Sequence, residues 1–289
     1  HAFDGFAVEE YVQANGPGTS QRVMMAVPNG AKGPLPVVVV PFYFPEAMLG
    51  FDPKNGSVES PLAPAKTNLT YYAAVSYMSD LARRGYVTVS ADAYHLTYAT
   101  NGAPASSWAK WKHAGAALVR DWPGWTGIGK LVFDTRLLVD LICADRRVDA
   151  SRIGIWGWSF GGYLSALSMF RGEGTFKMAI SVAPVTNWRY YDNIYTERFM
   201  RTPQENPDGY DLNSPTTYAK QLKGKYLLIH GTADDNVHFQ NAMELVKALN
   251  EAGVEYDQFF FPNKNHFIMG GNTRTYLYNK LAKYILENL

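Results

Sequence analysis

A serine lies between two glycines at Gly157-Trp-Ser-Phe-Gly161, which is the G-x-S-x-G spacing of a nucleophile elbow. In such a turn the serine occupies a sharp strand-to-helix corner, and its hydroxyl projects from the end of a sheet. Glycine is needed two positions to either side because the strand and the helix pass close together. The flanking residues 153–156 are typical of a short buried strand, and residues 163–170 of a helix. We therefore expect Ser159 to be a nucleophile rather than part of an ordinary glycine-rich turn.

A serine hydroxyl needs a base that removes its proton, and the base needs an acidic residue that orients it. On sheets of this kind the three residues follow in the order Ser, Asp or Glu, His. Residues 227–237 are typical of a strand followed by a tight acidic turn, in which Asp234 and Asp235 compete for the role of the acid. The alternative role of this turn is capping of the next helix, which Asp235 or Asn236 could serve while Asp234 orients the base.

The expected base is His266, which ends a short loop after the predicted strand 256–261. One rival stays open, because His95 lies on a loop that leaves another strand end. The remaining histidines have structural explanations as a helix-interior residue, the end of a buried strand and the head of a helix; they are His113, His230 and His238.

The negative oxygen that forms during attack on a carbonyl needs two preorganised N–H donors. One is expected from the backbone of Phe160, directly after the nucleophile. The second is expected from the loop after the strand 37–40, where Phe42 or Tyr43 would supply a backbone N–H, or Tyr43 its phenol.

Strands alternate with helices from residue 36 to the end of the sequence, which predicts an α/β-hydrolase fold. We expect a single domain over residues 1–289, with a mostly parallel sheet covered by helices on both faces. The expected strands are 8–13, 21–27, 35–40, 86–90, 153–156, 177–182, 225–230 and 256–261. The expected helices are 71–84, 106–120, 129–144, 163–170, 242–251 and 275–289.

Amino-acid composition limits the classes of partner that the protein is expected to bind. Charged residues are 18% of the chain and the formal net charge is +1, so no strong field favours nucleic acid. No run of 18 apolar residues occurs, and no membrane span is expected. The single cysteine, Cys143, excludes an internal disulfide and a multi-cysteine metal site, and its apolar helical context predicts a buried thiol. We expect neither a metal nor a cofactor.

Four longer motifs resemble those of a known protein family. They are Gly157-Trp-Ser-Phe-Gly-Gly-Tyr163, Ala183-Pro-Val-Thr-Asn-Trp-Arg-Tyr-Tyr-Asp192, Tyr195-Thr-Glu-Arg198 and His230-Gly-Thr-Ala-Asp-Asp-Asn-Val-His-Phe239. From about residue 152 to residue 289 the chain resembles the catalytic domain of dipeptidyl peptidases in the prolyl oligopeptidase family of serine peptidases. The resemblance implies Ser159 as nucleophile, Asp234 as acid and His266 as base. It also implies a small hydrophobic pocket suited to proline, lined by Trp188, Tyr191, Tyr195, Asn236 and Val237.

The sequence also departs from that family. The β-propeller that precedes the catalytic domain in the dipeptidyl peptidases, and the paired glutamate that holds the substrate amine, are not found in it. Phe267 follows the base where the family usually has a small residue. Residues 1–150 are loosely similar to dienelactone-hydrolase-like and acetyl-xylan-esterase-like enzymes, so the chain is a possible composite with a join near residue 150.

The expected function is that of a serine hydrolase that cleaves acyl bonds through an acyl-Ser159 intermediate. The expected substrates are small-molecule esters, favoured over proline-type amides, or short peptides. A dipeptidyl or prolyl peptidase is the first alternative. A catalytically inactive or engineered scaffold is the alternative from another class.

Overall fold

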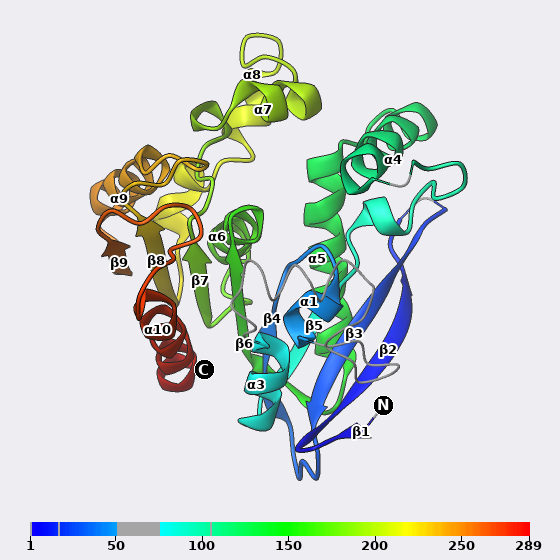
Figure 1. The fold of residues 1–289 in the computed structure, drawn as a ribbon, viewed down its shortest axis with the longest axis vertical. Coiled ribbons are helices and arrows are strands. Elements are labelled where there is room, and N and C mark those ends of the chain that lie inside the picture. Colours follow the sequence, from blue (N-terminus) through cyan, green and yellow to red (C-terminus); the bar gives the residue numbers. More distant parts are fainter. Residues whose placement is uncertain (1, 17, 51–75, 105) are drawn as a thin grey trace. The chain divides into compact units, whose positions relative to one another are not determined.

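The expected alternation of strands and helices is present along the chain (Figure 1). The computed structural model describes residues 2–16, 18–50, 76–104 and 106–289. The chain divides into two compact units, described separately below: the first comprises residues 1–35 and 42–148, and the second residues 36–41 and 149–289. The single domain over residues 1–289 and the join near residue 150 stay predictions.

The first unit is an antiparallel sheet with helices. Its strands are β1 (Ala2–Phe3), β2 (Phe6–Ala14), β3 (Ser20–Pro28) and β5 (Val87–Ala91), paired in that order. Its helices are α1 (Pro45–Leu49), α3 (Tyr77–Arg83), η1 (Tyr94–Leu96), α4 (Ser107–Asp121) and α5 (Gly127–Ala144). β3 is buried from Val23 to Val27 because β2 and β5 flank it and α3 packs on it.

A buried ion pair joins α5 to the end of the β2–β3 hairpin. The Lys130 ammonium, fully buried, donates to the Asp134 carboxylate and, at 2.5 Å, to the Asn15 carbonyl oxygen. The Asn15 side chain donates to the same carboxylate at 2.9 Å. Burial raises the pKa of Asp134 to about 6, against the opposing effect of Lys130. These groups depend on one another, because each would be costly to bury alone.

The second unit carries the parallel strands. They are β4 (Leu35–Val39), β6 (Val148–Trp158), β7 (Met178–Val182), β8 (Lys225–Gly231) and β9 (Asp257–Phe261), in the order β4-β6-β7-β8-β9. The pairs from β6 to β9 are all parallel. The helices are α6 (Phe160–Arg171), η2 (Trp188–Tyr190), α7 (Asn193–Met200), α8 (Pro207–Asp211), η3 (Pro215–Gln221), α9 (Gln240–Ala252) and α10 (Thr273–Asn288).

Both faces of this sheet are covered. All five residues of β7 are buried, and both α6 and α10 pack against this strand. Continuous burial of this kind is typical of a parallel strand with helices on each side. The prediction of an α/β-hydrolase fold with parallel strands is confirmed, and no blade of a β-propeller occurs in the described ranges.

The carboxyl ends of three strands lead into the predicted site residues. Ser159 follows β6 directly. Gly231 at the end of β8 lies opposite Phe261 at the end of β9, so the segments that carry Asp234 and His266 leave the sheet from the same edge. This edge is where the active sites of open α/β sheets lie.

Glycines allow the close approach of β6 and α6. A Cβ atom added at Gly157 would lie 2.3 Å from the backbone carbon of Gly161. One added at Gly161 would lie 2.8 Å from the Pro41 carbonyl oxygen, and one at Gly162 would lie 2.8 Å from the Val182 carbonyl oxygen. All three contacts are with backbone, which cannot move aside as a flexible side chain does.

Two expectations need adjustment. Cys143 is exposed, so the predicted buried thiol is wrong. The preceding residue, Ile142, is buried, and the side chains of consecutive helix residues point about 100° apart, so the Cys143 side chain points away from the core. Of the predicted helix 71–84, α3 covers residues 77–83, while residues 71–75 lie outside the described part of the chain. Among the helices of the described ranges, none has the length and apolar character needed to cross a bilayer.

The close approach at the elbow predicts a specific cost for one methyl group. Gly157→Ala forces a Cβ into the Gly161 backbone and should lower the free energy of unfolding by roughly 1–3 kcal/mol, as overpacking does. Gly33→Ala is the matched control, because a Cβ there meets nothing within 4 Å. Urea unfolding followed by circular dichroism measures both. Equal midpoints for the two variants would contradict this account of the elbow.

Candidate active site

Ser159 has the backbone geometry of a nucleophile elbow. Its φ of 57° and ψ of −117° place a non-glycine residue at positive φ, which is rare. Two backbone hydrogen bonds hold this conformation: the Ser159 N–H donates to Val182 at 2.8 Å, and its carbonyl accepts from Tyr163 at 2.9 Å. Ser159 is half-buried at the start of α6.

His266 and Asp234 are in direct contact. The distance from His266 Nδ1 to Asp234 Oδ2 is 2.8 Å, and both side chains are buried. Because an ionised carboxylate only accepts hydrogen bonds, the hydrogen of the neutral imidazole lies on Nδ1. His266 Nε2 is therefore free to accept a proton, which is the tautomer that a general base needs.

The His266 backbone is tied to the elbow strand. Trp158, which precedes Ser159, donates its indole N–H to the His266 carbonyl at 3.0 Å. Arg274 of α10 lies over the Trp158 ring at 5.3 Å. In the described part of the chain no hydrogen bond joins Ser159 Oγ to the His266 ring; such bonds often tighten only when substrate is bound.

Four donors surround the Asp234 carboxylate. Oδ1 accepts from the backbone N–H groups of Asn236 and Val237, each at 2.9 Å. Oδ2 accepts from His266 at 2.8 Å and from His230 Nε2 at 3.1 Å. Burial by itself raises the pKa of Asp234, but the hydrogen bonds from His230 and His266 hold it well below its usual range. Asp234 is therefore ionised at neutral pH.

The competing acid, Asp235, is exposed. The capping alternative does not apply to this turn, because α9 begins at Gln240 and the residue at its N-cap, Phe239, makes no capping hydrogen bond with its side chain. Asn236 instead accepts a hydrogen bond from the Tyr191 hydroxyl at 2.9 Å.

The rival base, His95, lies in the first unit. Its ring stacks on Trp111 with 3.7 Å between the ring centroids, and neither ring nitrogen has a hydrogen-bond partner within the described ranges. Burial, with a contribution from the Lys110 charge, lowers the pKa of His95 to about 3. A histidine that stays neutral and has no orienting acid is a poor general base.

The predicted oxyanion donors lie in different units. As the first residue of α6, Phe160 has a backbone N–H without an intrahelical acceptor. Tyr43 belongs to the first unit, where its ring packs against Phe42, Trp111 and His95 with centroid distances of 5.3, 5.7 and 6.4 Å. Its role stays a prediction.

Three aromatic rings of the predicted pocket form one cluster. Trp188 stacks on Tyr195 at 6.2 Å, and the Tyr191 ring meets both edge-on at 6.1 and 5.5 Å. Trp188 is buried, whereas both tyrosines are half-buried. The Phe160 ring lies 5.8 Å from Trp188, so the cluster adjoins the residue after the nucleophile. Val237 is fully buried beside Asp234.

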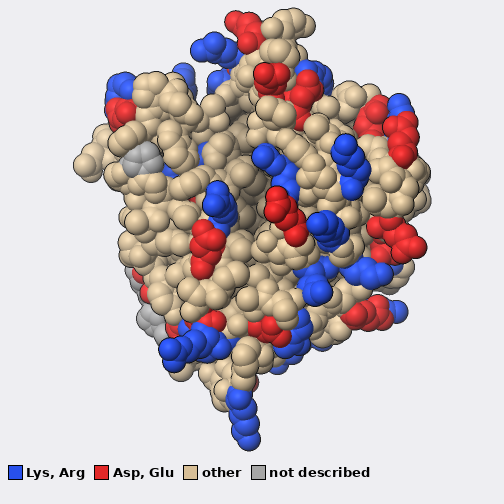
Figure 2. Space-filling view, turned by 180° about the vertical axis from the view of Figure 1, so that it is seen from behind, with Lys and Arg blue, Asp and Glu red and all other residues tan. Residues whose placement is uncertain are grey.

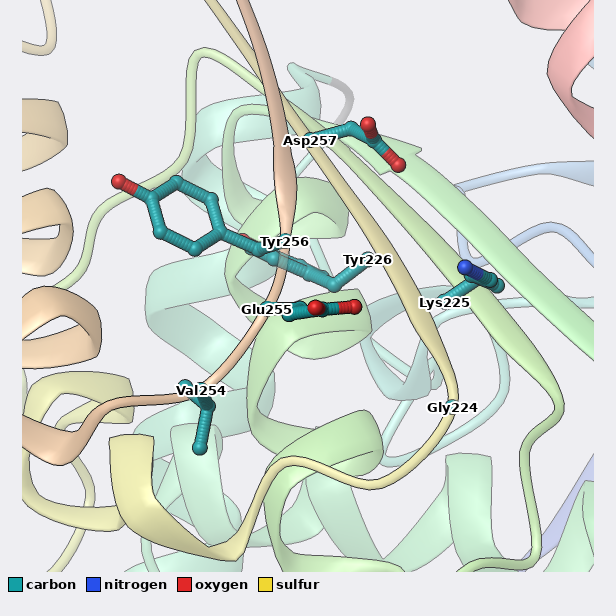
Figure 3. A pocket seen from close by; sticks show the side chains of 7 residues that line it. All are labelled: Gly224, Lys225, Tyr226, Val254, Glu255, Tyr256 and Asp257. Atoms are coloured by element: carbon teal, nitrogen blue, oxygen red, sulfur yellow. The ribbon is translucent and has the colours of Figure 1, made fainter.

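A cavity of about 320 Å³ lies elsewhere in the second unit (Figure 3). Its lining runs from Gly224 to Tyr226 at the start of β8 and from Val254 to Asp257 at the start of β9. These are the amino ends of the strands whose carboxyl ends carry the Asp234 and His266 segments. In Figure 3 the side chains of Tyr256 and Lys225 point to opposite sides of this cavity.

Sequence interpretation missed the position of His230. It was interpreted only as the end of a buried strand, yet its ring contacts Asp234, the predicted acid. The available signal was its spacing: His230 ends a strand four residues before Asp234, and a tight turn returns the chain toward it. In the described residues, no cluster of His, Cys, Asp and Glu side chains has an arrangement that could hold a metal ion.

Known proteins resemble the chain in sequence and in structure. The model of the prolyl oligopeptidase family matches residues 130–289. A probable dipeptidyl-aminopeptidase B from Fusarium vanettenii is 49% identical over 143 residues, and dipeptidyl peptidase 4 from Felis catus is 45% identical over 143 residues. Each alignment covers 48% of this chain and only 16% and 19% of those proteins, respectively.

The crystal structure of Porphyromonas gingivalis dipeptidyl peptidase 4 superposes with a TM-score of 0.72 at 32% identity. That alignment covers 98% of this chain, so it reaches into the first 150 residues, and 36% of the solved chain. Since the family model matches more than half of the sequence, the chain belongs to the prolyl oligopeptidase family of serine peptidases.

Proposed function

We propose that this chain hydrolyses acyl bonds through a covalent acyl-Ser159 intermediate, with His266 as general base and Asp234 as the acid that orients it. The 2.8 Å contact between the buried His266 and Asp234 carries the proposal. The strained backbone of Ser159 at the end of β6 supports it, because this conformation is the one that presents a nucleophile.

The proposed reaction has two halves. His266 Nε2 takes the Ser159 hydroxyl proton while Oγ bonds to the substrate carbonyl carbon; the leaving group then departs with that proton. Water attacks the acyl-serine in the same way and releases the acid product. The Phe160 N–H would donate to the transient oxyanion.

The proposed acyl-binding surface is the aromatic cluster of Trp188, Tyr191 and Tyr195, with Asn236 and Val237 beside it. Its contact with Phe160 next to the nucleophile supports this role. The Tyr191–Asn236 hydrogen bond links the cluster to the turn that carries the proposed acid. The half-buried rings of Tyr191 and Tyr195 offer flat apolar faces to a five-membered ring or a short acyl group.

Two substrate classes compete for this site. The similarity to dipeptidyl-aminopeptidase B and dipeptidyl peptidase 4 favours a dipeptidyl peptidase, although this chain spans under a fifth of the length of these relatives. We propose that the 289-residue chain, assayed by itself, prefers small acyl esters. Alkoxide and phenolate leaving groups depart more readily than amines, so an ester needs less help from binding energy remote from the reacting bond.

The acid assignment predicts a large difference between two neighbouring carboxylates. Asp234→Asn should lower kcat for p-nitrophenyl acetate by about 10⁴-fold, because the amide favours the wrong His266 tautomer. Asp235→Asn, which alters an exposed side chain, is the matched control and should stay within about 3-fold of the wild type. Comparable losses in the two variants would show that Asp234 is not the acid.

Substrate choice gives a second test. We expect kcat/KM for p-nitrophenyl acetate to exceed that for Gly-Pro-p-nitroanilide, and Tyr191→Ala to lower ester turnover roughly 10- to 100-fold through lost pocket contact. Tyr190→Ala is the control, since this adjacent tyrosine lies outside the cluster, and Ser159→Ala measures background activity. A ratio that favours the anilide would overturn the ester preference and support the peptidase alternative.

A further inference from the structure

His230 is a fully buried histidine at the end of β8, immediately behind the proposed acid. Its Nε2 lies 2.8 Å from the Val237 carbonyl oxygen and 3.1 Å from Asp234 Oδ2. Both neighbours are hydrogen-bond acceptors, so the hydrogen lies on Nε2 and is shared between them. The His230 Nε2–H group thereby contacts both the Asp234 carboxylate and the backbone of the following turn at Val237.

The other ring nitrogen of His230 has no partner within the described ranges. A hydrogen on Nδ1 would be a buried donor without an acceptor, and Nδ1 without a hydrogen is a buried acceptor without a donor. A residue needed only to fill space would avoid that cost with an apolar side chain. An unsatisfied buried group of this kind calls for a functional explanation.

We propose that His230 is a positioning residue, which fixes and stabilises the Asp234 carboxylate so that it orients His266. This inference rests on the proposed function and deepens it. The two histidines donate to the same oxygen, Oδ2, at 3.1 and 2.8 Å. His230 therefore controls how much negative charge Oδ2 presents to the base, and it keeps that oxygen aimed at Nδ1.

The groups around this carboxylate come from three places. His230 belongs to β8, His266 to the loop after β9, and the two backbone donors to the turn at Asn236 and Val237. Arg274 of α10 lies over the Trp158 ring. No cation in the described residues neutralises Asp234, so its charge depends on neutral donors, His230 among them.

Removal of the His230 N–H donor should shift the pH dependence of kcat/KM in a predictable direction. Without the His230 N–H, more negative charge remains on Oδ2, and the bond to a protonated His266 becomes stronger. The imidazolium then persists to higher pH, so the acid limb of the kcat/KM profile moves upward. A hydrogen bond to a charged group supports a shift of about 0.5–1 pH unit. A merely structural defect would lower the rate without moving this limb.

The test compares four single variants and the wild type in pH–rate profiles on p-nitrophenyl acetate. His230→Phe should lose roughly 10- to 100-fold in kcat and show the upward shift, because it lacks the donor. His230→Gln can place an amide N–H where Nε2 lies, and should keep kcat within about 3-fold and the acid limb unshifted. His238→Phe is the matched control at an exposed position, with wild-type behaviour expected.

The Ser159→Ala variant distinguishes a failure of the proposed function from a failure of the role of His230 alone. An active Ser159→Ala enzyme overturns the proposed function itself. An inactive Ser159→Ala enzyme together with a His230→Phe profile that overlays the wild type overturns the role of His230 alone. If His230→Phe does not fold, His230→Asn takes its place, since its shorter amide reaches only the Nδ1 position. The inference is overturned if the acid limb of the pH–rate profile is unshifted in His230→Asn. It is also overturned if that limb shifts equally in His230→Gln.

Discussion

A buried negative charge is the constraint on which the proposed site depends. The Asp234 carboxylate lies in the interior of the second unit, where an ion without partners would lose more solvation than any single contact returns. Two backbone N–H groups and two imidazoles satisfy its oxygens instead. The charge is thereby stable without a cation, and it can orient a base and stabilise the imidazolium that forms during reaction.

The sheet supplies these donors from separate stretches of the sequence. β8 and β9 run parallel and end level with each other, so the turn after one and the loop after the other meet at one edge. Trp158 extends the same arrangement to β6, since its indole N–H donates to the His266 carbonyl one residue before Ser159. The three proposed catalytic residues, Ser159, Asp234 and His266, thus each follow a strand end of this sheet closely rather than lying on long loops.

Much of this was predictable from sequence because it follows from local rules. Alternating strands and helices give the α/β fold, and the glycines around Ser159 indicate the elbow, because a Cβ at Gly157 would collide with backbone. The choice between Asp234 and Asp235 was not predictable from residue types, since adjacent carboxylates differ only in the direction that the turn gives them. The contact of His230 with Asp234 and the exposure of Cys143 likewise depend on how a turn closes and how a helix is rotated.

Covalent labelling directly tests whether Ser159 is an activated nucleophile. A fluorophosphonate reacts by forming a bond between Ser159 Oγ and phosphorus with loss of fluoride, and only an activated serine attacks it rapidly. Intact-mass and peptide mass spectrometry should find one adduct on the 157–163 peptide of the folded wild type, absent in Ser159→Ala and much slower to form in Asp234→Asn. Folded wild-type protein that stays unlabelled, or that is labelled equally in Ser159→Ala, would contradict the account.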